Sequence, residues 1–99
     1  MSSREAREAR IKRLRMRSMR RGIKEMDLIL VAYAEARLVA MDAPALDRYD
    51  ALLSENDQDL YQWVSGQMTP PPAHAALIAD IRDVALSAAG GVGQTGRVG

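Results

Sequence analysis

The chain of 99 residues contains no cysteine, no phenylalanine and only one histidine. Without cysteine it can form no disulfide, present no thiolate nucleophile and build no zinc site from thiolates. The single histidine, His74, cannot supply a centre of several histidines, so we expect no metal ligands. A chain without disulfides suits a reducing compartment such as the cytoplasm.

Long apolar runs are also missing. The longest uncharged apolar run, Leu28 to Ala34, is far shorter than the ~20 residues of a membrane-spanning helix, so we expect no membrane span. Hydrophobic residues make up 47% and charged residues 27% of the chain, which is a globular composition. A chain of this length fits one small domain, in which a large enclosed active site is not expected.

The net charge of +1 conceals two oppositely charged parts of the chain. Residues 1–24 contain ten arginines and lysines against two glutamates, whereas residues 25–99 contain four basic residues against eleven acidic ones. This division favours an anionic partner for the basic end, and a nucleic acid and an acidic protein surface both satisfy that condition.

The arginine-rich N-terminal segment also resembles a mitochondrial transit peptide. Transit peptides are poor in acidic residues, however, and Glu5 and Glu8 lie where a helix dipole favours negative charge. We therefore predict a bacterial cytoplasmic protein and keep the mitochondrial matrix as the lesser alternative.

Capping signals and apolar spacing predict two helices in the first 40 residues. Ser2 and Glu5 form a capping-box pattern, and no proline or glycine interrupts the basic segment that follows. Its few apolar residues predict a mostly exposed helix, and Gly22 is predicted to end it in a left-handed conformation. The second helix is predicted over residues 23–39, and we expect it to be the buried one because its middle is apolar on nearly all sides.

Three shorter helices are predicted downstream. Asp42 and Pro44 are typical of a helix start, and apolar residues at 46, 49, 52 and 53 share one face of the third helix. A polar break over residues 54–57 precedes the fourth helix, which is predicted to end near Gly66. Prolines 70–72 precede the fifth helix, whose apolar spacing continues to position 88.

No segment shows the strict apolar–polar alternation of a half-buried strand, and no repeat of a fixed period is visible. The sequence therefore predicts an all-α fold, a small five-helix bundle that forms a single domain over residues 1–89. Residues 90–99 are predicted to be a disordered, glycine-rich C-terminal tail.

Candidate chemical motifs are weak. A GxGxxG pattern over residues 91–96 lacks the preceding strand and the following helix of a dinucleotide site, so we interpret it as a chance match. His74 has no serine, cysteine or second histidine for a catalytic relay and is predicted to be solvated. Trp63 could stack on a nucleic-acid base, but a lone tryptophan at apolar helical spacing is predicted to be the chief core anchor. We therefore predict no catalytic, cofactor-binding or metal-binding residues and no enzyme activity.

The most informative segment joins the first two predicted helices, from Arg20 to Asp27. A purely local interpretation has Gly22 ending one helix while Glu25 and Asp27 complement the dipole of the next. That interpretation leaves unexplained why several charges gather around a glycine that permits close backbone approach. The segment therefore indicates a docking corner.

These residues resemble the SdhE family, also called succinate dehydrogenase assembly factor 2 or the flavinator proteins. The family hallmark RGxxE occurs here as residues 21–25, extended by Arg20 before it and Asp27 after it. A second block also matches the family, with a leucine pair at 52–53, an acidic stretch at 55–59 and the run LYQW at 60–63. Two blocks in order make the resemblance specific over residues 10–86.

The resemblance implies an assembly factor that binds the flavoprotein subunit of succinate dehydrogenase, with the fumarate reductase flavoprotein as a second candidate. It also implies that the factor promotes covalent attachment of FAD to a histidine of that partner, so FAD is the cofactor of the partner and not of this chain. The implied partner-binding residues lie in the docking corner and are Arg20, Arg21, Gly22, Glu25 and Asp27. We expect the free protein to be a monomer.

An alternative of another class is a small basic helical protein that binds nucleic acid along its first helix. The excess of acidic residues in the remainder of the chain disfavours this alternative. It also leaves the RGxxE segment without a role.

Overall fold

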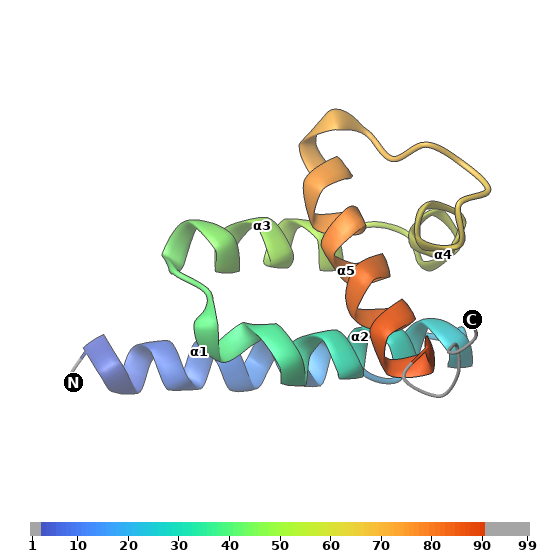
Figure 1. Cartoon of the computed structure of the whole chain (residues 1–99). Coiled ribbons are helices and arrows are strands. Elements are labelled where there is room, and N and C mark those ends of the chain that lie inside the picture. The colour runs from blue at the N-terminus through green and yellow to red at the C-terminus, as the bar shows by residue number, and fades with distance from the viewer. Residues whose placement is uncertain (1–2, 91–99) are drawn as a thin grey trace.

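The computed structural model describes residues 3–90, which form five α-helices and one short 3₁₀ helix. The helices in chain order are α1 (Ser3–Arg17), α2 (Lys24–Arg37), the 3₁₀ helix η1 (Leu38–Ala40), α3 (Ala43–Leu53), α4 (Asp57–Ser65) and α5 (Pro72–Gly90) (Figure 1). The predicted all-α fold of five helices is confirmed. Gly90 lies in α5, while residues 91–99 of the predicted tail and Ser2 of the predicted capping box lie outside the described residues.

The second helix, α2, packs against α1, α4 and α5. Figure 1 shows α1 and α2 running along the same side of the molecule in opposite directions. In this view α5 begins above α3 and runs down to α2. The third helix contacts α1 and α5. The loop between α1 and α2 therefore emerges at the end of the bundle near α4.

The core contains residues from all five helices. Its largest fully buried side chains are Tyr33 and Tyr49, whose ring centroids lie 5.6 Å apart in a tilted arrangement. The other buried apolar residues are Leu14, Met26, Leu30, Ala34, Leu38, Leu46, Leu52, Leu53, Leu60, Val64, Ile78 and Ile81. Trp63 is only partly buried and packs against this cluster, so the prediction that it is the chief core anchor was wrong. Tyr33 and Tyr49 are instead the main aromatic side chains of the core, because their rings meet between α2 and α3.

The starts and ends of α3 and α4 follow directly from the sequence. The Asp42 carboxylate accepts a hydrogen bond from the Ala45 backbone N–H at 2.9 Å and caps α3. Asn56 caps α4 in the same way, and Gly66 ends α4 with a φ of +86°. These caps satisfy backbone groups that a helix terminus leaves without partners, which confirms the predicted boundaries.

The first helix ends earlier than its composition predicts. α1 stops at Arg17, and the next residue, Ser18, turns its hydroxyl into the core. This hydroxyl donates to the Leu14 carbonyl at 2.8 Å and lies 2.6 Å from the Tyr49 hydroxyl. Gly22 is therefore not the residue that ends the helix. The prediction was wrong because a tertiary contact with α3 takes the chain out of the helix one turn earlier.

The second helix is buried on one face only. Met26, Leu30, Tyr33 and Ala34 are buried, but the side chain of Leu28 is 63% exposed. The expectation of a helix buried on nearly all sides was wrong, because no other helix covers the face that carries Leu28. The predicted length of this helix also includes η1, which continues it as a tighter turn.

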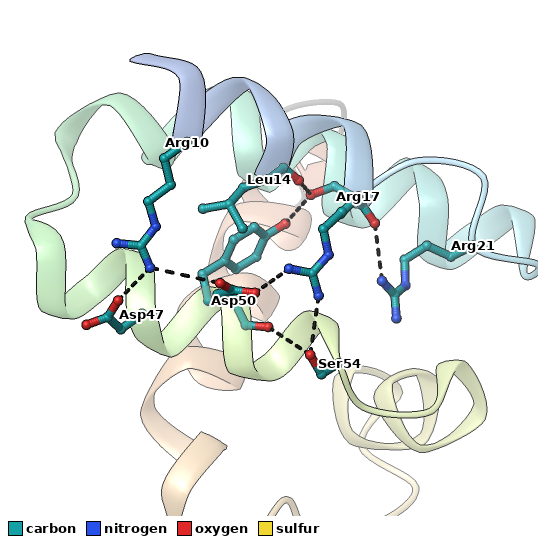
Figure 2. Close-up of polar contacts among 9 residues, drawn as sticks. Arg10, Leu14, Arg17, Arg21, Asp47, Asp50 and Ser54 are labelled. Carbon is teal, nitrogen blue, oxygen red and sulfur yellow. Dashed lines mark hydrogen bonds and ion pairs between the residues drawn. The ribbon is translucent and has the colours of Figure 1, made fainter. Parts of the chain in front are cut away.

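The basic first helix contacts acidic residues of the same chain. Figure 2 shows Arg10 and Arg17 directed towards α3, where Arg10 pairs with Asp47 at 2.5 Å and Arg17 pairs with Asp50. Arg15 pairs with Glu35 of α2 at 3.5 Å. Exposed pairs such as these contribute little to stability, but they reduce the positive charge that α1 presents. The expectation that this helix is simply exposed and basic is thus corrected, since part of its charge is balanced within the fold.

The Tyr49 hydroxyl gives the fold a specific alkaline sensitivity. Burial raises the pKa of Tyr49 to about 12 from its ordinary value of 10.0. Since the fold favours the neutral phenol, this contribution to the free energy of unfolding is complete below pH 10 and falls as the pH rises towards 12. We expect Tyr49→Phe to cost about 1 kcal/mol near neutral pH through the lost hydrogen bond with Ser18.

Urea unfolding followed by circular dichroism checks this prediction. The difference in unfolding free energy between the wild type and Tyr49→Phe should shrink or reverse between neutral and strongly alkaline pH, because the variant has no phenol to ionise at this position. The full shift corresponds to about 2–3 kcal/mol. A difference that stays constant across this range contradicts the assignment.

Candidate partner-binding site

The candidate site is the loop of residues 18–23 between α1 and α2, together with the first turn of α2. Two of its residues have left-handed backbone conformations, Arg20 with a φ of +55° and Gly22 with a φ of +111°. Two reversals of this kind, separated by one residue, let the chain leave one helix and enter the next within a few residues. The loop therefore has a defined shape that its glycine makes possible.

Arg21 points inward and holds this loop against the connection between α3 and α4. Its Nε lies 2.7 Å from Asp57 Oδ1, and its Nη2 donates to the Glu55 carbonyl at 3.2 Å. Its Nη1 donates to the Arg17 carbonyl at 3.2 Å, a contact drawn in Figure 2. The Arg21 side chain is only 12% exposed. Because these hydrogen bonds are charge-assisted and partly desolvated, the Arg21 side chain is the main contact that holds the loop in place.

Asp27 closes the loop from the other side. Its carboxylate accepts a hydrogen bond from the Arg21 backbone N–H at 2.6 Å. The residue lies in the first turn of α2, where the helix dipole also favours a negative charge. Ile23, which precedes α2, makes no side-chain capping bond. Asp27 therefore stabilises both the loop and the start of the helix.

Gly22 is exposed between these two fastenings. A Cβ at this position would lie 3.4 Å from Asp57 Oδ2, which is ordinary van der Waals contact. The backbone conformation, and not a lack of space, is thus what requires glycine here. Without a side chain, the exposed backbone of Gly22 is also open to close approach by a partner.

Glu25, Arg20 and Lys24 are the exposed charges of the corner. The Tyr61 hydroxyl of α4 donates to Glu25 Oε1 at 3.3 Å. The negative charge of Glu25 raises the pKa of Tyr61. The side chains of Arg20 and Lys24 have no ion-pair or hydrogen-bond partner among residues 3–90 and are available to a ligand.

The five residues that the sequence singles out therefore lie together but face different ways. Arg21 and Asp27 turn towards the protein, while Arg20, Gly22 and Glu25 face the solvent. Sequence reasoning missed Tyr61 and Asp57, which complete the corner from α4. Both residues lie in the second motif block. The occurrence of that block together with RGxxE was the sequence signal that could have identified them.

His74 supports the corner from α5 and is not the solvated residue that we predicted. Its side chain is 10% exposed, and Nε2 lies 2.8 Å from Glu55 Oε2. Its ring centroid lies 5.7 Å from that of Trp63. The prediction was wrong because the Trp63 indole covers the imidazole when α4 and α5 pack together. Glu55 thus connects His74 to Arg21, which binds the Glu55 carbonyl.

Neither a metal-ligand cluster nor a membrane-spanning helix is found among the described residues. Within residues 3–90, no group of three or more histidine, aspartate or glutamate side chains is placed to hold a metal ion. Asp57 pairs with Arg21, and Asp80 pairs with Arg37. None of the helices in this range combines the length and the apolar character needed to cross a bilayer.

The fold and the corner together define a small all-helical protein with an exposed charged loop that Arg21 and Asp27 hold in place. Residues 12–85 match the protein family described as the flavinator of succinate dehydrogenase, and the chain belongs to this family. The resemblance stated from the two motif blocks is confirmed. No solved structure shows significant similarity to the chain.

Several fungal proteins named succinate dehydrogenase assembly factor 2, mitochondrial, are similar to this chain. That of Candida glabrata is 45% identical over 60 residues, which cover 61% of this chain and 39% of the relative. Those of Meyerozyma guilliermondii and Schizosaccharomyces pombe are 41% and 39% identical over 70 and 67 residues, covering 69% and 68% of this chain. The chain spans 52% and 48% of those two relatives, about half of their length.

These names correct one prediction. The relatives are designated mitochondrial, so the expectation of a bacterial cytoplasmic location was wrong. The error came from using Glu5 and Glu8 as evidence of compartment, although both are compatible with a basic helix of a folded domain. Glu8, for example, pairs with Arg4 within α1.

Proposed function

We propose that this protein is an assembly factor that binds the flavoprotein subunit of succinate dehydrogenase and promotes covalent attachment of FAD to a histidine of that subunit. The family description and the names of the relatives support this function. The structural observation that carries the proposal is the braced corner, in which Arg21 and Asp27 hold a loop that presents Arg20, Gly22 and Glu25. The relatives bear mitochondrial names, and we propose that the protein acts in the mitochondrial matrix.

The roles of the corner residues follow from their positions. Glu25 is placed to pair with an arginine or lysine of the partner, and Arg20 to pair with an acid. Gly22 admits the partner's backbone, since it has no side chain to separate the two chains. Arg21 and Asp27 act as positioning residues, because their hydrogen-bonding groups are already occupied within the chain.

The chemistry takes place on the partner. Bond formation between an imidazole and the flavin methyl group needs near-attack geometry and stabilisation of the charge that develops on the flavin. A binding protein promotes it by binding the competent arrangement of the flavoprotein more tightly than other arrangements. The reacting histidine and FAD thus belong to the partner, and this chain contributes binding energy rather than a catalytic group.

The proposal also covers a second partner and the oligomeric state of the free chain. We propose that the flavoprotein of fumarate reductase is a second partner, and that the free chain is a monomer. The nucleic-acid alternative loses support because Arg10, Arg15 and Arg17 pair with acids of the same chain. The family description is that of a flavinator and agrees with a protein that is not itself an enzyme.

Covalent flavin on the flavoprotein tests the proposal. The purified apo-subunit is incubated with FAD and the chain, and covalent flavin is read as fluorescence on a denaturing gel. We expect a strong signal with the wild-type chain and at least a tenfold lower initial rate with Glu25→Ala. Loss of one charge pair that becomes desolvated in the complex corresponds to about 1.4 kcal/mol or more, which is a factor of ten.

Glu8→Ala is the matched control, since Glu8 is an exposed glutamate that, among residues 3–90, forms an ion pair with Arg4 of its own helix alone. Its rate should equal that of the wild type. If the wild-type chain leaves the rate of flavin attachment unchanged, the proposed function is wrong. If Glu25→Ala is as active as Glu8→Ala, the site is not at this corner.

A further inference from the structure

A hollow of about 270 Å³ opens beside Glu25, between α2, α4 and α5. The residues that line it are Glu25, Ile29, Tyr61, Val64, Ser65, Arg82, Ala85 and Leu86. Pockets for drug-sized ligands measure about 300–1,000 Å³, so this hollow suits a protein side chain better than a cofactor. Because Glu25 lines it, the hollow continues the docking corner across the face of the bundle.

The inner wall of the hollow is apolar, and its rim exposes more apolar surface. Val64 belongs to the buried core, Ile29 packs against that core, and both line the hollow. Leu86 lines the hollow and is 69% exposed. Leu28 does not line it, but it lies one helical turn from Glu25 on α2 and is 63% exposed. Large apolar side chains exposed around a concave surface are typical of an interaction site.

The rim also carries two opposite charges. Glu25 supplies a carboxylate on the α2 side, and Arg82 supplies a guanidinium on the α5 side. Arg82 has no acidic partner among the described residues. A Cβ on Gly66 would lie 3.3 Å from Arg82 Nη2, so the guanidinium rests over the C-terminal end of α4. The dipole of α4 favours a cation there, but it leaves the hydrogen-bond donors of Arg82 available.

We propose that this hollow receives one apolar side chain of the flavoprotein partner, in a segment that places a basic residue against Glu25 and an acidic residue against Arg82. The mixed charge of the rim favours a protein segment over a nucleic acid or an anionic membrane, since Glu25 repels both of the latter. This inference rests on the proposed function for the identity of the partner. It adds a second, apolar contact area to the charged corner, where anchoring side chains contribute most of the affinity.

Filling the hollow tests the inference without removing any contact of the fold. Ala85 is half-buried on α5 and lines the hollow, so Ala85→Trp places a large side chain in the space that the partner would use. We expect the Kd for the purified apo-flavoprotein, measured by calorimetry with the full chain, to rise at least tenfold. The matched control is Ala79→Trp, because Ala79 is exposed on the same helix and does not line the hollow. Its Kd should stay within twofold of wild type.

A second pair of variants does not depend on how Trp is accommodated. Leu86→Asp should also raise the Kd at least tenfold, whereas Val39→Asp should not, since Val39 is 74% exposed on η1 and lies outside the hollow. Thermal unfolding midpoints within a few degrees of wild type establish that each variant is folded. Arg82→Glu should weaken binding as well, because it reverses the charge at one rim.

The outcomes separate this inference from the proposed function. If the wild-type chain binds the flavoprotein and promotes flavin attachment while Ala85→Trp and Leu86→Asp bind equally well, the hollow is not a docking pocket although the function stands. If Val39→Asp and Ala79→Trp weaken binding as much as the variants in the hollow, the inference is also wrong. If the wild-type chain neither binds the flavoprotein nor promotes flavin attachment, the proposed function itself is wrong.

Discussion

Replacing Gly22 with alanine is expected to lower the rate of covalent flavin attachment by roughly ten- to a hundredfold. Gly22 has a φ of +111°, a conformation in which an L-residue is strained. Strain of this kind is on the order of 1–3 kcal/mol, and each 1.4 kcal/mol is a factor of ten in an equilibrium constant. The strain shifts the loop away from its binding-competent shape, and apparent affinity falls by the fraction that remains competent.

Backbone strain, and not steric crowding by the new Cβ, is the expected cause of the lower rate. A Cβ at Gly22 meets only Asp57 Oδ2, at an ordinary contact distance of 3.4 Å. A chain made by chemical synthesis with D-alanine at position 22 should therefore retain most of the activity, since a D-residue readily adopts a positive φ. Circular dichroism should show unchanged helix content in both proteins, because the loop lies outside the helices. An L-alanine variant with full activity would contradict this account of the corner.

Removing the Arg21 side chain is expected to produce the largest loss of stability among the charged residues of the corner. Arg21→Ala removes the 2.7 Å ion pair with Asp57 and the hydrogen bonds to two backbone carbonyls. It also leaves Asp57 without its cation, although the Asp57 side chain is only 25% exposed. We expect the free energy of unfolding to fall by about 2–4 kcal/mol, measured by urea denaturation.

A double-mutant cycle separates the ion pair from the other contacts of Arg21. Arg21→Ala, Asp57→Ala and the double variant should give a coupling free energy of about 1–2 kcal/mol. Arg21→Lys should recover only part of the stability, since an ammonium cannot reproduce the fork that reaches Asp57 and two carbonyls. A coupling energy near zero would show that the pair does not hold the loop.

The same variants distinguish a positioning residue from a contact residue. If Arg21 acts by holding the loop, Asp57→Ala should also lower the affinity for the flavoprotein, because it loosens the same fastening from the other side. If Arg21 itself touches the partner, Asp57→Ala should bind normally while Arg21→Ala does not. Calorimetric Kd values at a temperature well below the unfolding transition provide this comparison.

The helices of this protein were largely predictable because their signals are local. Capping residues such as Asp42 and Asn56, and the terminating Gly66, act on neighbouring backbone groups, so the structure has these boundaries where the sequence predicts them. The buried face of α3 was predicted correctly for the same reason, since apolar spacing along one helix needs no knowledge of its neighbours. The family was recognisable from two motif blocks that match in order.

The candidate site was only partly predictable. The motif located the corner in the chain, but the side-chain orientations depend on residues far away in sequence. Arg21 and Asp57 are 36 positions apart, and so are Glu25 and Tyr61. The division of the motif into bracing and exposed residues therefore stays hidden until α4 packs beside the loop.

By itself, the sequence determined the helical class, most helix boundaries, the family and the position of the corner, because local hydrogen bonding, apolar periodicity and linear motifs are properties of neighbouring residues. Only the tertiary structure decided that α1 ends at Arg17, that its arginines pair with acids of α2 and α3, and that His74 is covered by Trp63. Only the tertiary structure, likewise, made a hollow beside Glu25. Burial and ion pairing are set by which helices meet in space, and in this protein those meetings join residues that the chain keeps far apart.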